Sequence, residues 1–257
     1  MADDRVPTVV VDDVHIVYRV LGGGAGGSSA LSTLKRIATR APSTAIREVH
    51  AVKGVSFTAY QGEAIGLIGS NGSGKSTLLR AVAGLLPAER GRIYTRGQPS
   101  LLGVNAALMN DLSGERNVVL GCLAMGMSPA EVRARTQEII DFSGIDERGA
   151  FSSLPMSAYS SGMAARLRFA IAAVKKHEVL LIDEALATGD ATFRAKSENR
   201  VRELRAQAGT VFLVSHSLES IRDTCDRTLW LEAGVLRMDG PTDEVLRAYE
   251  GFATSDR

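Results

Sequence analysis

A glycine-rich segment, Gly69-Ser-Asn-Gly-Ser-Gly-Lys-Ser76, most strongly constrains how this chain can fold. It matches the pattern GxxxxGK[ST] in full, between a short apolar run, Glu63–Gly69, and a helical stretch, Leu78–Ala83. Glycines let the backbone curl so that successive N–H groups face an anion, and the following helix N-terminus adds positive potential. The alternative, an ordinary Gly/Ser-rich turn, does not explain a complete match in this strand–loop–helix context. We therefore expect a phosphate-binding loop on an α/β sheet.

The loop predicts specific roles for its side chains. We expect Lys75 to reach the β- and γ-phosphates of a bound nucleotide, and the Ser76 hydroxyl to hold Mg²⁺. The residues expected to contact the nucleotide here are Gly69, Ser70, Asn71, Gly72, Ser73, Gly74, Lys75, Ser76 and Thr77.

A second apolar run, Val179-Leu-Leu-Ile-Asp183-Glu184, ends in two carboxylates. An acid at the end of a buried strand is placed to ligate Mg²⁺, directly or through water, and Asp183 fits that role. Glu184 is then placed to polarise the attacking water. Hydrophobic strands that end in acids are common, so the signal gains its weight from lying downstream of a phosphate loop.

Tyr159-Ser-Ser-Gly-Met163 precedes a helical stretch and lies one helix upstream of Asp183. Here the chain resembles the ABC ATPase family, whose signature has the form LSGGQ in this place. Ser160 and Gly162 are kept, whereas the other three positions differ. In that family the segment binds the γ-phosphate of the nucleotide held by the partner subunit. The resemblance therefore implies a homodimer in the ATP-bound state, with Ser160, Ser161 and Gly162 at the shared site.

Other family elements follow in order. The resemblance implies that His216 contacts the γ-phosphate and that Asp190 belongs to the loop that contacts the partner subunit. Tyr18 either stacks on adenine or is a plain surface tyrosine. The family's glutamine that couples to a permease should lie near Gly103–Asn105, but it is absent there, so either Asn105 substitutes for it or the coupling differs.

Local patterns predict the elements. Ser128-Pro-Ala-Glu131 is a capping box with proline at the first helical position. We expect strands at 8–18, 54–60, 63–69, 91–95, 100–103, 179–182 and 210–214, a hairpin over 228–238, and helices at 78–83, 128–142, 161–175, 192–206 and 242–249.

Strands that alternate with helices predict a mostly parallel sheet, interrupted by a helical insertion. The resemblance implies an α/β, P-loop NTPase (RecA-like) fold with an N-terminal antiparallel β part. We expect a single domain over 1–257, with a catalytic lobe at about 1–103 and 176–257, a helical subdomain at about 104–175 and an insertion at about 19–48.

Composition excludes several classes of protein. The chain is 45% apolar and 23% charged, with a formal net charge of +1, so nothing points to nucleic acid as a partner. The N-terminus lacks the pattern of a signal peptide, and no apolar stretch approaches the ~18 residues of a membrane span. Cys122 and Cys225 have no CxxC or Cys/His context, so we expect buried, reduced thiols. We expect a cytoplasmic protein, peripheral to the membrane.

Within the family, the details look like the ATPase of polysaccharide exporters of the O-antigen, teichoic-acid and cell-wall galactan type. The segments that carry this likeness are Leu112–Asn117, Ala164–Phe169, Glu184–Asp190 and Trp230–Gly234. The resemblance implies a separate integral-membrane permease and a lipid-linked glycan cargo. Some members carry a C-terminal carbohydrate-binding domain, but this sequence stops at Arg257, so we expect the glycan to be recognised elsewhere.

Three alternatives remain at this point. An ABC ATPase could energise export of another substrate. A soluble ABC ATPase that acts on DNA or ribosomes needs a long coiled coil or two cassettes in one chain, and this sequence has neither. A phosphate-loop kinase should lack the series formed by Tyr159–Met163, Asp183 and His216.

The insertion carries its own pattern. Gly22–Ser29 is rich in glycine and serine, and Leu31–Arg40 has a short apolar stripe beside basic side chains only. A helix of about ten residues is marginal in water, so this one needs a surface. It packs either on its own domain or against the permease and anionic headgroups.

Overall fold

The computed structural model describes residues 5–21, 46–102, 108–147, 149–175, 177–183, 191–215 and 217–255. The stretch rich in glycine and serine at 22–29 and the basic helix expected at 31–40 lie outside these residues. The strands are β1 (Pro7–Leu21), β2 (Ile46–Tyr60), β3 (Ala64–Ile68), β4 (Arg90–Thr95), β5 (Ser100–Leu101), β6 (Val179–Asp183), β7 (Thr210–Val214), β8 (Arg227–Glu232) and β9 (Val235–Pro241). The α-helices are α2 (Lys75–Val82), α3 (Gly114–Ala124), α4 (Pro129–Ser143), α5 (Ser161–Ala172), α6 (Ala191–Gln207), α7 (Leu218–Thr224) and α8 (Thr242–Ser255), with short 3₁₀ turns at Phe151–Ser153 and Met156–Ala158.

Strands β2, β1 and β4 form an antiparallel sheet in that order. Its inner face buries β-branched side chains such as Val9, Val11 and Val52, which explains why this valine-rich stretch folds as strands. Both long strands extend beyond their predicted limits, because Arg19 pairs with Glu48 across the hairpin. The ends of the expected insertion at 19–48 therefore belong to this sheet.

A second sheet has the strand order β5-β6-β7-β3-β8-β9 among the described residues. Within this sheet, adjacent strands from β5 through β8 run parallel to one another, and β9 runs antiparallel to β8 at the edge. Side chains of β6 alternate between two cores: Val179 and Leu181 face the core that contains α2, while Leu180 and Ile182 face the core that contains α6. Burial of both faces is why β6 reads as a continuous apolar run. The α/β fold expected from the sequence is confirmed.

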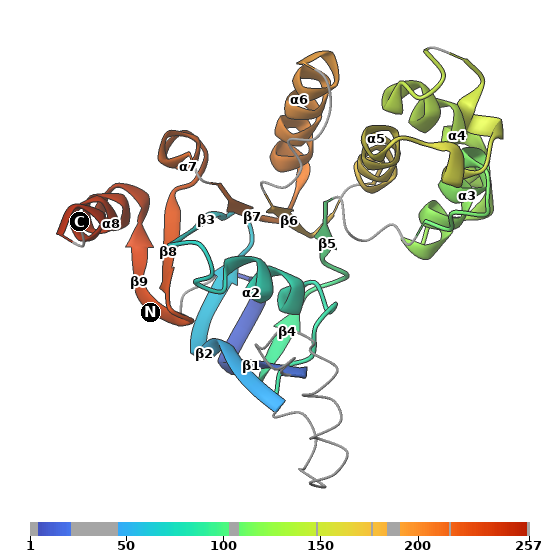
Figure 1. Cartoon of the computed structure of the whole chain (residues 1–257). Helices are drawn as coiled ribbons and strands as arrows, with labels where there is room; N and C mark the ends of the chain where they lie inside the picture. The colour runs from blue at the N-terminus through green and yellow to red at the C-terminus, as the bar shows by residue number, and fades with distance from the viewer. Residues whose placement is uncertain are drawn as a thin grey trace, which may run out of the picture.

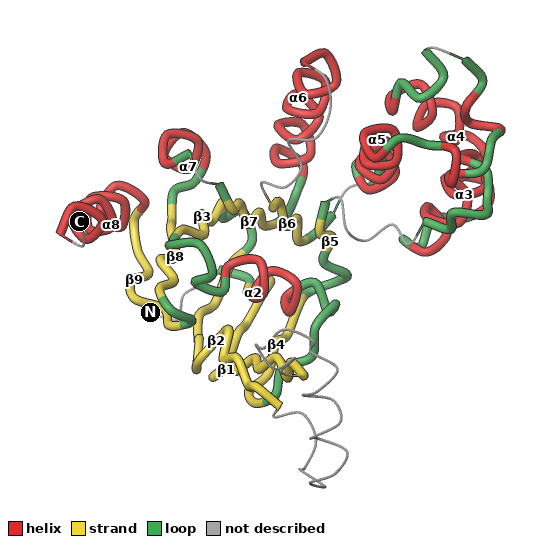
Figure 2. Tube along the Cα trace, in the orientation of Figure 1, coloured by secondary structure: helices red, strands yellow, loops and turns green. Residues whose placement is uncertain are grey.

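Helix α2 lies between the two sheets (Figure 2), where Leu78, Leu79 and Val82 join the core that both sheets share. It begins at Lys75, three residues before its predicted start, because Gly74 closes the glycine loop directly onto the first helical turn. Its end matches the prediction. Ala83 is the C-cap, and Gly84 follows with a φ of 73°.

Helices α3, α4 and α5 pack around a core of their own at one end of the molecule (Figure 1). The capping box is confirmed: the Ser128 hydroxyl accepts from the Glu131 N–H, and the Glu131 carboxylate accepts from the Ser128 N–H. Sequence patterns did not predict α3, whose outward face carries Val119, Leu120 and Leu123 and so blurs its periodicity. The predicted helix at 161–175 ends earlier, at Ala172.

Helices α7 and α8 lie at the opposite end of the sheet, beside β8 and β9 (Figure 1). The Trp230 ring on β8 packs against the rings of Tyr249 and Phe252 on α8. These contacts carry α8 to Ser255, beyond its predicted end, and α7 was not predicted because it is short. Cys122 and Cys225 are both buried, as expected, in separate cores. No helix within the described residues is long and apolar enough to span a bilayer.

Candidate nucleotide-binding site

The loop at 69–76 connects β3 to α2 and depends on its glycines. Gly69 has a φ of 142° and Gly74 a φ of 105°, and both values are unfavourable for other residues. A Cβ on Gly69 would overlap the Leu231 carbonyl, and one on Gly74 would overlap the Ala51 carbonyl. Glycine therefore lets the loop curl while it stays packed against β8 and β2.

Lys75 carries its charge into the centre of this loop. Its side chain is only 7% exposed, and Nζ donates to the carbonyl oxygens of Gly69, at 2.7 Å, and Ser70, at 2.8 Å. The first turn of α2 contains no acidic residue, so the positive potential of the helix N-terminus adds to the lysine charge. This arrangement fits an anion such as a phosphate.

Tyr18 lies beside the start of α2. It sits near the end of β1, where it pairs with Val49, and its hydroxyl is 3.3 Å from the Thr77 hydroxyl. The ring is half-buried and adjacent to the phosphate loop. That position suits an aromatic platform for a base whose phosphates bind the loop.

Asp183 ends β6 at the level where the phosphate loop begins. It pairs with Val214 of β7, which in turn pairs with Leu67 of β3. Two strand spacings, about 10 Å, separate the β6 and β3 backbones. Within the described part of the chain no three metal-type side chains gather. One carboxylate and the Ser76 hydroxyl across a gap of this size are nevertheless a donor set that suits Mg²⁺, which keeps several of its waters.

Several predicted site residues fall outside the described residues. They are Glu184, Asp190, His216 and the positions around Gly103–Asn105. Their roles rest on the sequence alone.

The signature segment belongs to α5. Ser160 is the N-cap, and its hydroxyl accepts from the Met163 N–H at 3.2 Å. Tyr159, which replaces the family's leucine, packs into the helical core, and its hydroxyl donates to the Phe151 carbonyl at 2.7 Å. Ser160 and Ser161 are exposed. The structure does not bring this segment to the chain's own phosphate loop, because α5 lies with α3 and α4, apart from α2 (Figure 1).

Sequence reasoning missed Glu232, which contacts the phosphate loop. Its carboxylate accepts from the Ser70 hydroxyl and, at 3.4 Å, from the Ser70 N–H. The two residues lie 162 positions apart. The only signal in the sequence was the run Trp230–Gly234, which resembled a family segment but gave no reason to place it beside the loop.

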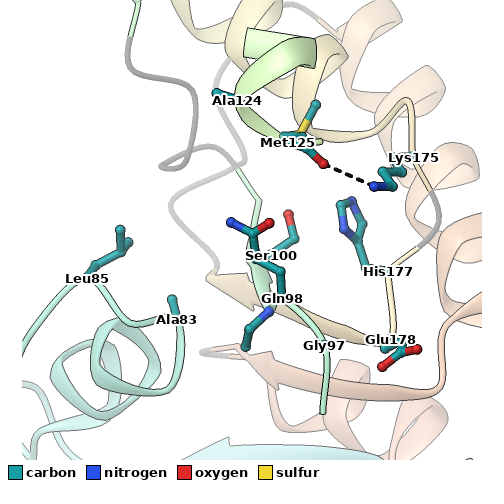
Figure 3. Close-up of a pocket in the computed structure, with 11 residues that line it drawn as sticks. Ala83, Leu85, Gly97, Gln98, Ser100, Ala124, Met125, Lys175, His177 and Glu178 are labelled. Atoms are coloured by element: carbon teal, nitrogen blue, oxygen red, sulfur yellow. Dashed lines mark hydrogen bonds between the residues drawn. The ribbon is translucent and has the colours of Figure 1, made fainter. Parts of the chain in front are cut away.

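A cleft of about 470 Å³ opens where the helical core meets the sheet (Figure 3). Ala83 and Leu85 lie on one side, and Lys175 Nζ donates to the Met125 carbonyl, at 3.0 Å, on the other. Ser100, at the start of β5, is buried, and no partner for its hydroxyl is found in the described part of the chain. The cleft lies at the amino ends of β5 and β6, whereas Asp183 ends β6 at the carboxyl end, so it is separate from the nucleotide site.

Comparison with known proteins agrees with this geometry. A family model described as ABC transporter matches residues 52–187. The teichoic acids export ATP-binding protein TagH of Enterococcus faecalis is 42% identical over 202 residues, which are 79% of this chain and 44% of that protein. The protein of the same name from Staphylococcus saprophyticus is 41% identical over 203 residues, 79% of this chain and 76% of that protein. The chain thus spans under half of the first relative and about three quarters of the second.

Solved structures share the fold. The ATP-binding subunit of an ABC transporter superposes with a TM-score of 0.68 and 23% identity, over 95% of this chain and 93% of that chain. A dimeric ATP-binding cassette, in a post-hydrolysis state with ADP and Pi, gives a TM-score of 0.67 at 20% identity, over 91% and 98%. With the phosphate loop, the strand-end aspartate and these matches together, the chain belongs to the ABC transporter family and has the fold of its ATP-binding domain.

Proposed function

We propose that this chain binds Mg-ATP at residues 69–76 and hydrolyses it as one half of a two-site dimer. The single observation that carries the proposal is the buried Lys75 ammonium inside a curled glycine loop at a helix N-terminus. Preorganised cations and N–H groups are what phosphoryl transfer requires, because its catalysis is mostly positioning and charge stabilisation.

Each side chain has a defined part in this proposal. Lys75 holds the β- and γ-phosphates, and Tyr18 stacks on adenine. Ser76 and Asp183 hold Mg²⁺, which when bound neutralises charge on the phosphates. Glu184 accepts a proton from the attacking water, and His216 contacts the γ-phosphate.

The position of the signature segment supports the proposed dimer. Ser160 and Ser161 are exposed at the start of α5, and α5 lies apart from α2 of the same chain (Figure 1). A two-fold axis lets the Ser160–Gly162 segment of one subunit reach the nucleotide on the partner subunit. The same axis makes the two sites equivalent.

We further propose that hydrolysis drives export of a lipid-linked polysaccharide through a separate membrane permease, with this chain at the cytoplasmic face. Support comes from relatives at about 40% identity that are named as teichoic acids export ATP-binding proteins. Recognition of the glycan and the path of transport depend on the whole exporter and not on this chain alone.

The cleft of Figure 3 is our candidate contact for the permease. Its lining comes both from the sheet side, with the exposed Leu85, and from the helical core, with Met125 and Lys175. A segment seated there would touch both parts of the chain at once. In the sequence, β5 ends two residues before Gly103–Asn105, where the resemblance would place the coupling glutamine.

The decisive experiment compares ATP hydrolysis by the purified wild type, Lys75→Ala and Lys196→Ala, alone and with the co-expressed permease in vesicles. Lys196, an exposed lysine on α6, provides the control. We expect permease-stimulated turnover in the wild type and in Lys196→Ala, and at least a hundredfold loss in Lys75→Ala. Equal turnover in all three would refute the catalytic assignment. Stimulation by DNA or by a phosphate acceptor, with none by the permease, would point to another class of NTPase.

A further inference from the structure

The β8–β9 hairpin meets the phosphate loop at the end of β8. Ile68 pairs in register with Trp230, so Ser70 and Glu232, each two residues further on, come to the same level. One carboxylate oxygen of Glu232 accepts from the Ser70 hydroxyl. The other accepts from the Ser70 N–H and from the Trp230 indole N–H, each at 3.4 Å.

The turn of the same hairpin holds the loop at a second point. The Gly234 N–H donates to the Ser73 carbonyl at 3.0 Å, and the Gly234 carbonyl accepts from the Lys53 N–H at 2.8 Å. Ala233 and Gly234 have φ values of 50° and 86°, the left-handed pair typical of a two-residue hairpin turn. The hairpin therefore contacts the loop both near its start and in its middle.

Glu232 is held as a carboxylate. Burial raises its pKa, but hydrogen bonds from the Ser70 hydroxyl and N–H, the Trp230 indole and the Ala233 N–H together outweigh burial and leave the pKa below its ordinary value. A negative charge beside a loop that receives phosphates works against binding by Coulomb repulsion. Its contribution to the site must then be geometric.

We propose that Glu232 is a positioning residue that fixes Ser70, and with it the first turn of the phosphate loop, in the conformation that receives the nucleotide. The inference rests on the proposed nucleotide binding. Glu232 does not touch the phosphates in this scheme. By holding Ser70 before the nucleotide binds, Glu232 reduces the conformational entropy that the loop loses on binding. Preorganisation of this kind increases the affinity for the nucleotide.

Helix α8 supports the contact from behind. The Trp230 ring packs against Tyr249, at 5.5 Å between ring centroids, and Phe252, at 5.2 Å. This packing fixes the indole whose N–H reaches Glu232. Trp230→Phe keeps a ring in the α8 contact while it removes that one donor, so we expect at most a twofold change in affinity.

The test is calorimetric titration with Mg-ADP, which avoids hydrolysis, on Glu232→Ala, Ser70→Ala, their double variant and Glu232→Gln. For Glu232→Ala we expect about tenfold weaker binding, which corresponds to loss of one hydrogen bond to a charged group. Ser70→Ala should lose about threefold, since its N–H remains. The double variant should be no weaker than Glu232→Ala, because the two residues act through one contact.

Glu232→Gln distinguishes geometry from charge. Its carbonyl oxygen can accept from the Ser70 and Trp230 N–H groups while its amide donates to the Ser70 hydroxyl, so we expect affinity within twofold of the wild type. Glu138→Ala, an exposed glutamate on α4, is the matched control and should bind normally. Unfolding midpoints of all variants show whether each one is folded. If Glu232→Ala does not fold, the comparison of Glu232→Gln and Ser70→Ala with the wild type still tests the inference.

Two outcomes separate this inference from the function on which it rests. No Mg-ADP binding by the wild type would overturn the proposed function and this inference together. Binding that is lost in Lys75→Ala but unchanged in Glu232→Ala would overturn this inference alone. Additive losses in the double variant, or a Glu232→Gln variant as weak as Glu232→Ala, would also contradict it.

Discussion

Asp183 and Leu67 stand at the same level of the parallel sheet, each paired in register with Val214 on the strand between them. Because all three strands run in the same direction, their carboxyl ends meet at one edge. The phosphate loop leaves that edge two residues after Leu67, so the acid and the loop face the same space although 116 positions separate Asp183 from Leu67 in the sequence.

Asp183→Asn should raise the Mg²⁺ concentration needed for half-maximal ATP hydrolysis at least tenfold. The amide keeps an oxygen ligand but removes the charge that attracts the cation. Titration of activity with MgCl₂ at fixed ATP measures the shift. Asp141→Asn, an exposed change on α4, is the control, and identical Mg²⁺ curves for both variants would refute the metal role.

Glu184→Gln should bind ATP with near wild-type affinity and hydrolyse it at least a hundredfold more slowly, because an amide cannot accept the proton of water. ATP that is not hydrolysed should then hold two subunits together at their shared sites. Sedimentation with Mg-ATP should show a dimer that reverts to monomer when ATP is removed. A variant that stays monomeric with ATP, both alone and beside the permease, would contradict shared sites.

Tyr18→Ala should raise the KM for ATP by about five- to a hundredfold, since stacking of a base on an aromatic ring contributes about 1–3 kcal/mol. Tyr18→Phe should remain close to the wild type, because the ring stays and only the contact of its hydroxyl with Thr77 is lost. Steady-state kinetics of the two variants give the comparison. If Tyr18→Ala leaves KM unchanged, Tyr18 is the plain surface tyrosine considered at first.

His177 should make the folded state sensitive to acid. Burial lowers its pKa, the hydrogen bond to the Ala172 carbonyl opposes that shift, and the nearby Lys175 charge adds to it. The net pKa lies below the ordinary 6.5, so the unfolded chain takes up the proton first as the pH falls. Stability from this residue is complete above pH 6.5 and decreases as the pH drops below it.

Urea unfolding of the wild type and His177→Gln at pH 7.5 and pH 5.5 measures this effect. The fall in unfolding free energy between the two pH values should be smaller in the variant, because the variant has no imidazole at position 177 to protonate. The carboxylates contribute equally to both proteins. A fall of the same size in both would show that His177 does not contribute.

Local chemistry accounts for the elements that sequence patterns placed well. The capping box at Ser128 and the glycine after α2 satisfy helix ends with neighbours in the sequence, so they need no other part of the chain. Strand β7 matches its prediction, Thr210–Val214, because its apolar run is bounded by a glycine. Helix α3 escaped prediction because Val119, Leu120 and Leu123 face outward and obscure its helical periodicity.

The sequence by itself indicated the phosphate loop, the acid at the end of β6 and the family, because the glycine loop and the apolar run that ends in an acid are local patterns, and their order along the chain is typical of the family. Only the tertiary structure decided that β7 lies between β3 and β6, and that Glu232 meets Ser70 across 162 positions. Strand order and cross-strand contacts arise from long-range pairing and the packing of both sheet faces. These energies belong to the assembled sheet and to no local pattern of residues.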